Sequence, residues 1–153
     1  MKIRSQVIEV DNFKAFGAVL KKPVHEPTAQ GDTFKFWSDI VNYKIDGNTE
    51  IGLCTVYKDD SKPLKTVERH LYTPEILIPV DAPFVLPVVA DNDTIHAFKV
   101  KTGEAVIIDP GVWHGPCIPV GKNESTYYVI FRKGTPGDDV EKKDISGVMI
   151  NIQ

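Results

Sequence analysis

Short strand-length segments separated by turn residues restrict the fold of this chain more than any other feature of its sequence. The segments are rich in Val, Ile, Phe and Tyr, and they recur along the chain. They span residues 34–37, 43–45, 51–57, 66–71, 75–80, 84–90, 94–100, 105–108 and 126–132. Eleven prolines spread through the chain fit many tight connections and few helices. This pattern predicts an all-β barrel or sandwich.

The N-terminal region departs from this pattern. Residues 3–10 have the composition of a strand, and apolar side chains then recur at helical spacing. Asp11 is a suitable N-cap and Gly17 a suitable stop, so we expect one short helix at residues 12–16. Further along, Asp-Gly-Asn at residues 46–48 has the chemistry of a hairpin turn.

Composition limits the classes of partner and the cellular compartment. The chain has 153 residues and no internal boundary or repeat, so residues 1–153 are expected to form one domain. Its net charge of -3 gives no basic face for nucleic acid, and no apolar run approaches the length of a membrane span. Cys54 and Cys117 lie far apart, which suggests reduced thiols, and the N-terminus has no signal-peptide pattern. We therefore expect a cytoplasmic protein with no nucleic-acid or membrane partner.

Three ionisable residues lie close together in the segment TVERHLYTPE, at Glu68, His70 and Glu75. In a strand Glu68 and His70 share one face, and Arg69 points to the other. An ionisable side chain turned into a barrel must be paired, hydrogen-bonded or metal-bound. If the strand presents its other face inward, the carboxylate is solvated instead. Periodicity leaves both orientations open.

A second stretch, GEAVIIDPGVWH at residues 103–114, ends in another histidine. The Pro-Gly turn before it directs Trp113 and His114 to opposite faces of the following strand. Taken alone, His114 fits a histidine hydrogen-bonded at a barrel rim. Taken with the Glu68/His70 segment, it favours a metal site or an acid/base site.

Three further side chains are candidates for contact with a substrate: Arg69, His96 and Tyr128. His96 shares a strand face with Phe98, a pattern that is also typical of a histidine packed in a core or at a rim. Tyr128 could contact a small anion, and a packed or solvated surface position is its alternative.

The two stretches resemble the paired motifs of the cupin barrels. In the first motif, residues 68–70 (Glu-Arg-His) stand for His-x-His, and Glu75 follows after four residues. In the second, Gly103, Gly111 and His114 match at the same spacing. The resemblance implies a cupin-type double-stranded β-helix, or jelly-roll barrel, with a site inside its mouth.

Among the cupins, the chain is most similar to the ureidoglycolate lyase family, also called ureidoglycolate hydrolase. The segments DNFKAFGAVL, FKFWSD, VERHLYTPEILIPVDAPFVLPVVA, TIHAFKV and GVWHGP occur in the same order as in that family. The resemblance implies a lyase that cleaves ureidoglycolate to glyoxylate and urea in purine (allantoin) catabolism. It also implies a homodimer that acts on a small molecule.

The chain departs from the family pattern at the expected site. Glu75 stands where the family often has glutamine, and Gly115 replaces the second histidine of a Trp-His-His-Pro run. Glu68 also replaces the first histidine of the general cupin motif.

The resemblance implies two ways in which these residues could act. His70 or His114 could be the general base, with Glu68 orienting a histidine or the ureido group. A divalent metal held by Glu68, His70, Glu75 and His114 could instead polarise the substrate. Such mixed nitrogen and oxygen ligands suit Mn, Fe, Ni or Zn.

Two alternative functions remain open at this point. One is a metal-dependent cupin enzyme that acts on another small hydroxy or sugar acid, which the retained Glu75 favours. The other is a non-catalytic cupin that binds a metabolite, although no DNA-binding helix or second domain accompanies it.

Overall fold

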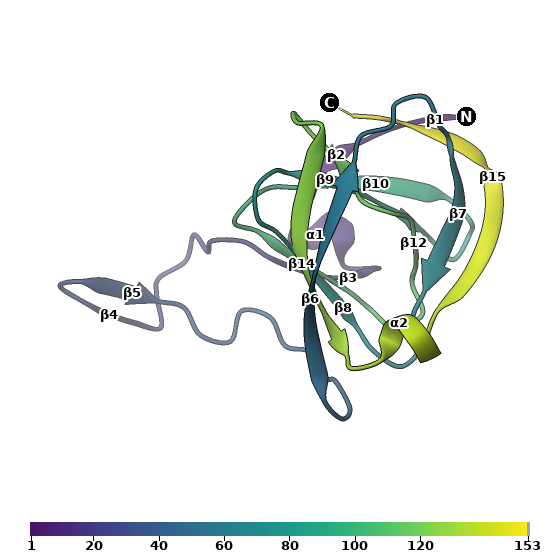
Figure 1. Cartoon of the computed structure of the whole chain (residues 1–153). Helices are drawn as coiled ribbons and strands as arrows, with labels where there is room; N and C mark the ends of the chain where they lie inside the picture. The colour runs from purple at the N-terminus through teal and green to yellow at the C-terminus, as the bar shows by residue number, and fades with distance from the viewer. Residues whose placement is uncertain (153) are drawn as a thin grey trace.

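Two β-sheets enclose a hydrophobic core in the computed structural model of the chain, which describes residues 1–152 (Figure 1). The larger sheet has the strand order β1-β15-β7-β12-β9-β10-β2, with β13 paired to β9. Its strands are β1 (Lys2–Arg4), β15 (Glu141–Asn151), β7 (Leu64–Arg69), β12 (Trp113–His114), β9 (Phe84–Val89), β10 (Ile95–Val100), β2 (Gln6–Val7) and β13 (Ile118–Pro119).

The smaller sheet has the strand order β3-β11-β8-β14-β6. Its strands are β3 (Gly17–Leu20), β11 (Ala105–Ile108), β8 (Glu75–Pro79), β14 (Glu124–Arg132) and β6 (Thr49–Tyr57). Because strands with few helices between them form both sheets around one core, the prediction of an all-β barrel with a short N-terminal helix is confirmed.

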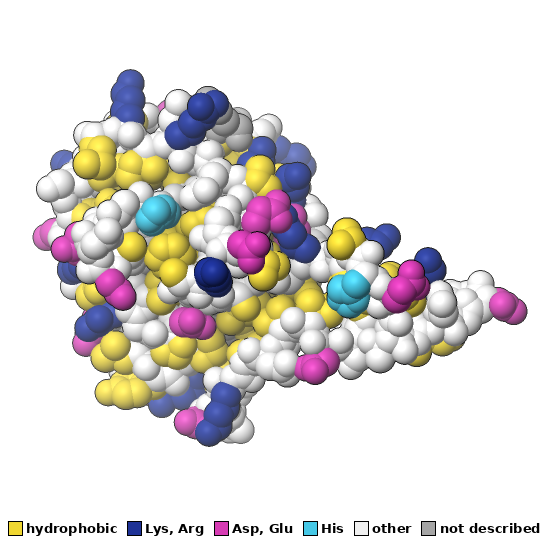
Figure 2. Space-filling view, turned by 180° about the vertical axis from the view of Figure 1, so that it is seen from behind, with side chains coloured by type: hydrophobic (Ala, Val, Ile, Leu, Met, Phe, Trp, Pro, Cys, Tyr) yellow, Lys and Arg dark blue, Asp and Glu magenta, His cyan; other side chains and the backbone are white. Residues whose placement is uncertain are grey.

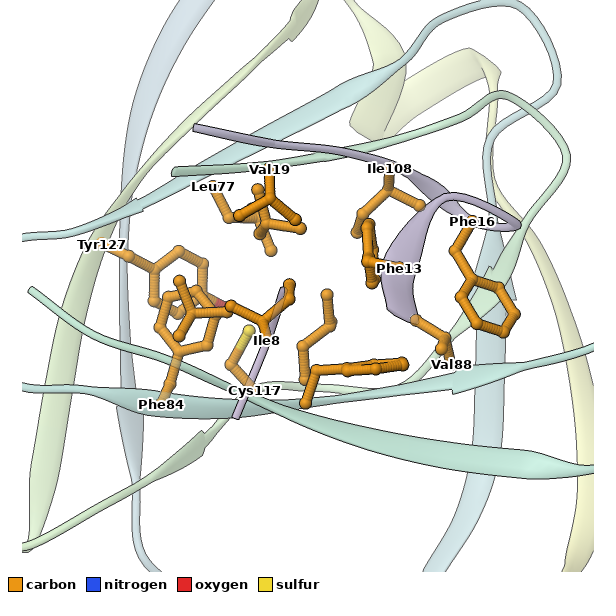
Figure 3. Close-up of a cluster of buried hydrophobic side chains, with 14 residues drawn as sticks. Ile8, Phe13, Phe16, Val19, Leu77, Phe84, Val88, Ile108, Cys117 and Tyr127 are labelled. Atoms are coloured by element: carbon orange, nitrogen blue, oxygen red, sulfur yellow. The ribbon is translucent and has the colours of Figure 1, made fainter. Parts of the chain in front are cut away.

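The core lies between the inner faces of the two sheets. Alternate residues of β9, at Phe84, Leu86 and Val88, are fully buried there, as period-two alternation requires. Phe13 enters the same cluster and packs edge-on against Phe98, with ring centroids 5.2 Å apart. Figure 3 shows these apolar side chains filling the space between the strands. Hydrophobic packing therefore fills the space between the two sheets.

The N-terminal helix lies slightly earlier than the sequence predicts. Helix α1 spans Val10–Phe13, and Glu9 is its N-cap in place of Asp11. The backbone N–H of Glu9 donates to the side-chain oxygen of Asn12 (2.8 Å), so a capping box fixes the start. Gly17 does not stop the helix but begins β3, and three residues separate it from the last residue of the helix.

A hairpin arm projects from the body of the molecule, as Figure 1 shows. It pairs β4 (Ala29–Gly31) with β5 (Phe34–Phe36). The predicted strand at residues 43–45 and the predicted hairpin turn at residues 46–48 are wrong, because this region connects the arm to β6 without strand pairing.

The C-terminal region is more regular than its charged sequence suggests. Helix α2 (Thr135–Asp138) leads into β15, which pairs antiparallel with β7 and parallel with β1. This pairing places the end of the chain beside the strand that carries Glu68. Among residues 1–152, no helix is long and apolar enough to cross a membrane.

Candidate active site

Four ionisable side chains meet inside the barrel, next to the apolar core, where His114 is paired with Val88 and Glu75 with Ile108. Glu68 lies on β7 and is paired across the strands with His114 on β12, so the two side chains share the inner face. His70 follows the end of β7, and Glu75 begins β8 in the other sheet. Of the two orientations that periodicity allows for β7, the structure therefore has the one that turns Glu68 and His70 inward.

Arg69 on β7 and Trp113 on β12 alternate with the inward-facing residues, so their side chains point to the outer face. The guanidinium carbon of Arg69 lies 4.5 Å from the centre of the Trp113 ring, and the ammonium nitrogen of Lys143 lies 4.9 Å from it. Arg69 also forms an ion pair with Glu141, with 2.7 Å between Nε and Oε2. These outer-face contacts hold β7, β12 and β15 together behind the site.

Backbone carbonyls fix the orientation of both site imidazoles. Nδ1–H of His70 donates to the carbonyl oxygen of Asp139 (2.8 Å), and Nδ1–H of His114 donates to that of Val112 (3.0 Å). A carbonyl oxygen can only accept, so each Nδ1 carries the proton. Both rings therefore direct Nε2 into the site.

The carboxylate of Glu75 lies between the two imidazoles. Its Oε2 is 3.1 Å from Nε2 of His70 and 2.9 Å from Nε2 of His114. Two neutral rings would turn lone pairs toward this carboxylate, which is unfavourable. A positive charge, as a proton or as a metal ion, is therefore required between these groups.

The pKa values of the three groups follow from this arrangement. Burial would raise the pKa of Glu75, but its contacts with His114 and His70 outweigh burial and lower the pKa to about 2. Burial would lower the pKa of His70, but hydrogen bonding to Glu75 raises it to about 9. The pKa of His114 is likewise raised by Glu75 against the effect of burial. Without a metal, the site therefore contains an anionic Glu75 and imidazolium at neutral pH.

Nε2 of His114 is the polar atom of the site that remains available. It is buried, and it forms no aligned hydrogen bond with any acceptor among residues 1–152, including the nearby Glu75 carboxylate. Oε1 of Glu68 lies 4.0 Å from it, and the Glu68 side chain is 40% exposed. Glu68 thus lies between His114 and solvent.

Three of the four expected metal ligands form a group that could hold an ion. Ligand atoms of Glu68, His70 and His114 all lie within 4.8 Å of one another. Both histidines have the Nδ1 hydrogen bond that usually orients a metal-bound imidazole through Nε2. The unpartnered Nε2 of His114 fits the same role, so this donor set suits a divalent metal. Glu75, the fourth expected ligand, contacts both imidazoles directly.

Asp139 supports the site and has no counterpart in the sequence prediction. It is buried, and its carboxylate accepts the backbone N–H groups of Leu71 (2.8 Å) and Tyr72 (3.0 Å). With its carbonyl bound to His70, it fixes the turn that leads from β7 to β8. Asp139 lies 69 residues from His70, so no local spacing could have identified it.

The structure does not bring the three other candidate residues to this cluster. Arg69 and His96 line a separate surface pocket, where the His96 ring packs 5.6 Å from that of Phe16. Tyr128 is paired with Leu53 on the outer face of β14, and 42% of it is exposed.

Comparisons with known proteins agree with the sequence motifs. A family model described as ureidoglycolate lyase matches residues 1–151. Ureidoglycolate lyases of Chelativorans sp. (strain BNC1) and of Schizosaccharomyces pombe are each 25% identical to this chain, over 92% of this chain and 90% of the relative. Among solved structures, Bacillus subtilis oxalate decarboxylase matches 63% of this chain and 24% of its own, at 16% identity and a TM-score of 0.45. The family match spans nearly the whole sequence, and the chain belongs to the ureidoglycolate lyase family.

Proposed function

We propose that this protein cleaves ureidoglycolate to glyoxylate and urea. The observation that carries the proposal is the position of His114, whose Nε2 has no aligned partner and lies beside the half-exposed Glu68. A proton donor and a proton acceptor are thus adjacent at the accessible side of the site. Family membership makes the protein a lyase that acts on a small molecule.

The reaction needs one proton to move from oxygen to nitrogen. The substrate is a carbinolamide, in which one carbon bears a hydroxyl, a carboxylate and the ureido nitrogen. Glu68 accepts the hydroxyl proton while the C–N bond breaks and a C=O bond forms. Nε2–H of His114 donates a proton to the departing urea nitrogen, so atoms and charge balance. Such positioned proton transfers contribute about 10²- to 10⁴-fold to a rate.

The other site residues prepare His114 for this step. Glu75 raises the pKa of His114 against the effect of burial, which favours the protonated ring that donates the proton. His70 holds the same Glu75 oxygen, Oε2, by a hydrogen bond of 3.1 Å. Asp139 orients His70 through its carbonyl. The four residues thus form one connected unit around the acid.

A metal-dependent activity is the second candidate. Glu68, His70 and His114 would hold the ion, and a divalent metal such as Mn, Fe, Ni or Zn would polarise substrate oxygen atoms. This donor set favours an enzyme acting on ureidoglycolate or on another small hydroxy or sugar acid. In that case the Nε2 atoms of His70 and His114 would face the ion, and Glu75, whose Oε2 lies within 3.1 Å of both, would be a further carboxylate ligand.

One assay separates these functions. Purified protein is incubated with ureidoglycolate, and glyoxylate and urea are measured with and without a chelator. Equal amounts of both products in the presence of chelator support the proton route. Loss of activity that an added metal restores supports the metal-dependent candidate. No product under either condition contradicts the proposed lyase and leaves another acid substrate or a binding role.

We further propose a cytoplasmic homodimer that takes part in allantoin breakdown. Figure 2 shows hydrophobic side chains on the surface of the body and near the start of the arm. Ile51 and Leu53 on the outer face of β6 are 69% and 66% exposed, and Phe34 and Phe36 of the arm are exposed as well. Apolar surface of this kind is typical of subunit contacts. Both cysteines are free thiols, which suits a reducing compartment. Light scattering of the purified protein tests the dimer.

A further inference from the structure

We propose that Lys142 binds the carboxylate of the substrate, an inference that rests on the proposed function. Lys142 on β15 is paired directly with Glu68 on β7, and Glu68 is paired with His114 on β12. Directly opposed residues of antiparallel strands share a face. Lys142, Glu68 and His114 therefore form one row across the inner face of the sheet.

The row places a cation beside the two groups that transfer protons. Neighbouring strands lie about 4.8 Å apart, and a lysine side chain has a flexible four-carbon stem. The Lys142 ammonium can therefore reach over Glu68 without any movement of the backbone. Lys142 is exposed, so substrate has access to it.

The other basic side chains on the strands of this row face away from the site. Arg69 is paired with Glu141 and stacked on Trp113. Lys143 also lies over Trp113 and is 3.5 Å from Asp93. Lys142, in contrast, forms no ion pair with any residue in the described range 1–152.

The charge of the site explains why such a cation is needed. Glu68 and Glu75 both present carboxylates, and the substrate carries a third. The imidazoles of His70 and His114 compensate Glu75, so a further positive group beside Glu68 would offset the repulsion between Glu68 and the substrate carboxylate. In ureidoglycolate the carboxylate is bonded to the reacting carbon. An ammonium that holds it therefore places the hydroxyl and the ureido nitrogen near Glu68 and His114.

Steady-state kinetics of Lys142→Ala, Lys142→Gln and Lys142→Arg test this role, with Lys101→Ala as the control. Lys101 is an exposed lysine in the turn between β10 and β11, so its loss makes the same change in net charge. We expect KM for ureidoglycolate to rise about 10- to 100-fold in the Ala and Gln variants, the effect of losing one charge-assisted hydrogen bond. The Arg variant should keep most of the affinity, and kcat should change much less than KM.

A carboxamide analogue of the substrate distinguishes binding from a structural effect. Because the analogue lacks the negative charge, wild type and Lys142→Ala should bind it equally. Active wild type with an unchanged KM in Lys142→Ala would overturn the inference, as would an equal loss of affinity for the carboxamide. An inactive wild type would instead refute the proposed function, so the two failures are distinguishable.

Discussion

Nε2 of His114 lies 2.9 Å from Oε2 of Glu75, although the two residues belong to opposite sheets of the barrel. The site therefore exists only when the sheets are packed together. The hydrophobic core on one side and the turn fixed by Asp139 on the other maintain this separation. Folding and catalytic geometry are thus linked through the contacts of Glu75 with His114 and His70.

The stability of the metal-free protein should depend on pH through Glu75 and His70. The pKa of Glu75 is lowered from 4.5 to about 2, so its stabilising contribution is complete above 4.5 and is lost as pH falls toward 2. The pKa of His70 is raised from 6.5 to about 9, so its contribution is complete below 6.5 and is lost as pH rises through 9. Both contributions are complete between pH 4.5 and 6.5, so thermal melts in chelator should show the highest Tm in this range. Glu75→Gln should flatten the profile, and an unchanged profile in that variant would contradict the assignment.

Removal of the Asp139 carboxylate should destabilise the turn after His70. Asp139→Ala leaves two part-buried backbone N–H groups without their acceptor and removes a buried carboxylate, which costs about 1–3 kcal/mol in free energy of unfolding. Chemical denaturation measures this loss. The control is Asp138→Ala, which removes an exposed ion pair with Arg132 and should cost no more than about 1 kcal/mol. Equal effects of the two substitutions would contradict the role of Asp139.

Two glycines should respond differently to the same substitution. Gly17 has φ +150°, and an added Cβ would lie 1.8 Å from the carbonyl oxygen of Ile107. Gly17→Ala should therefore destabilise the fold by about 2–4 kcal/mol. An added Cβ at Gly52 meets nothing within 4 Å, so Gly52→Ala should be nearly neutral. Denaturant midpoints of the two variants check this difference, and similar midpoints would refute it.

Metal binding should require the inward-facing imidazole of His114. Calorimetric titration of chelator-treated protein with Zn²⁺ should give one site per chain, and His114→Gln should weaken it by at least about tenfold. His25→Gln, which changes an exposed histidine of the loop before the arm, is the matched control. Equal affinity in all three proteins would show that the site does not bind this ion through His114.

Much of the barrel could be predicted because its signals are local. The predicted strands at residues 75–80, 84–90, 94–100 and 105–108 match β8 to β11 within one residue at each end, since each carries its own apolar pattern and turn residues. Residues 43–45 have a strand-like composition but no neighbouring strand, so they stay irregular. The charged first half of β15 has no local strand pattern and is a strand through its pairing with β7.

The site was predictable only as far as its motifs extend. His70, His114, Glu68 and Glu75 could be identified as candidates, and the structure brings all four together. Whether their side chains point inward follows from the pairing of His114 with Glu68 across strands, and the periodicity of one strand does not define that pairing. Asp139 and Lys142 come from a segment distant in sequence, so only the pairing of β15 places them at the site.

The most direct test of the central claim is the rate of glyoxylate release from ureidoglycolate in chelator, compared among wild type, His114→Gln and His25→Gln. We expect wild type and His25→Gln to turn over ureidoglycolate, with urea and glyoxylate released in equal amounts. For His114→Gln we expect a rate about 10²- to 10⁴-fold lower, measured at a temperature at which the variant is fully folded. Turnover by a folded His114→Gln variant at the wild-type rate would contradict the account.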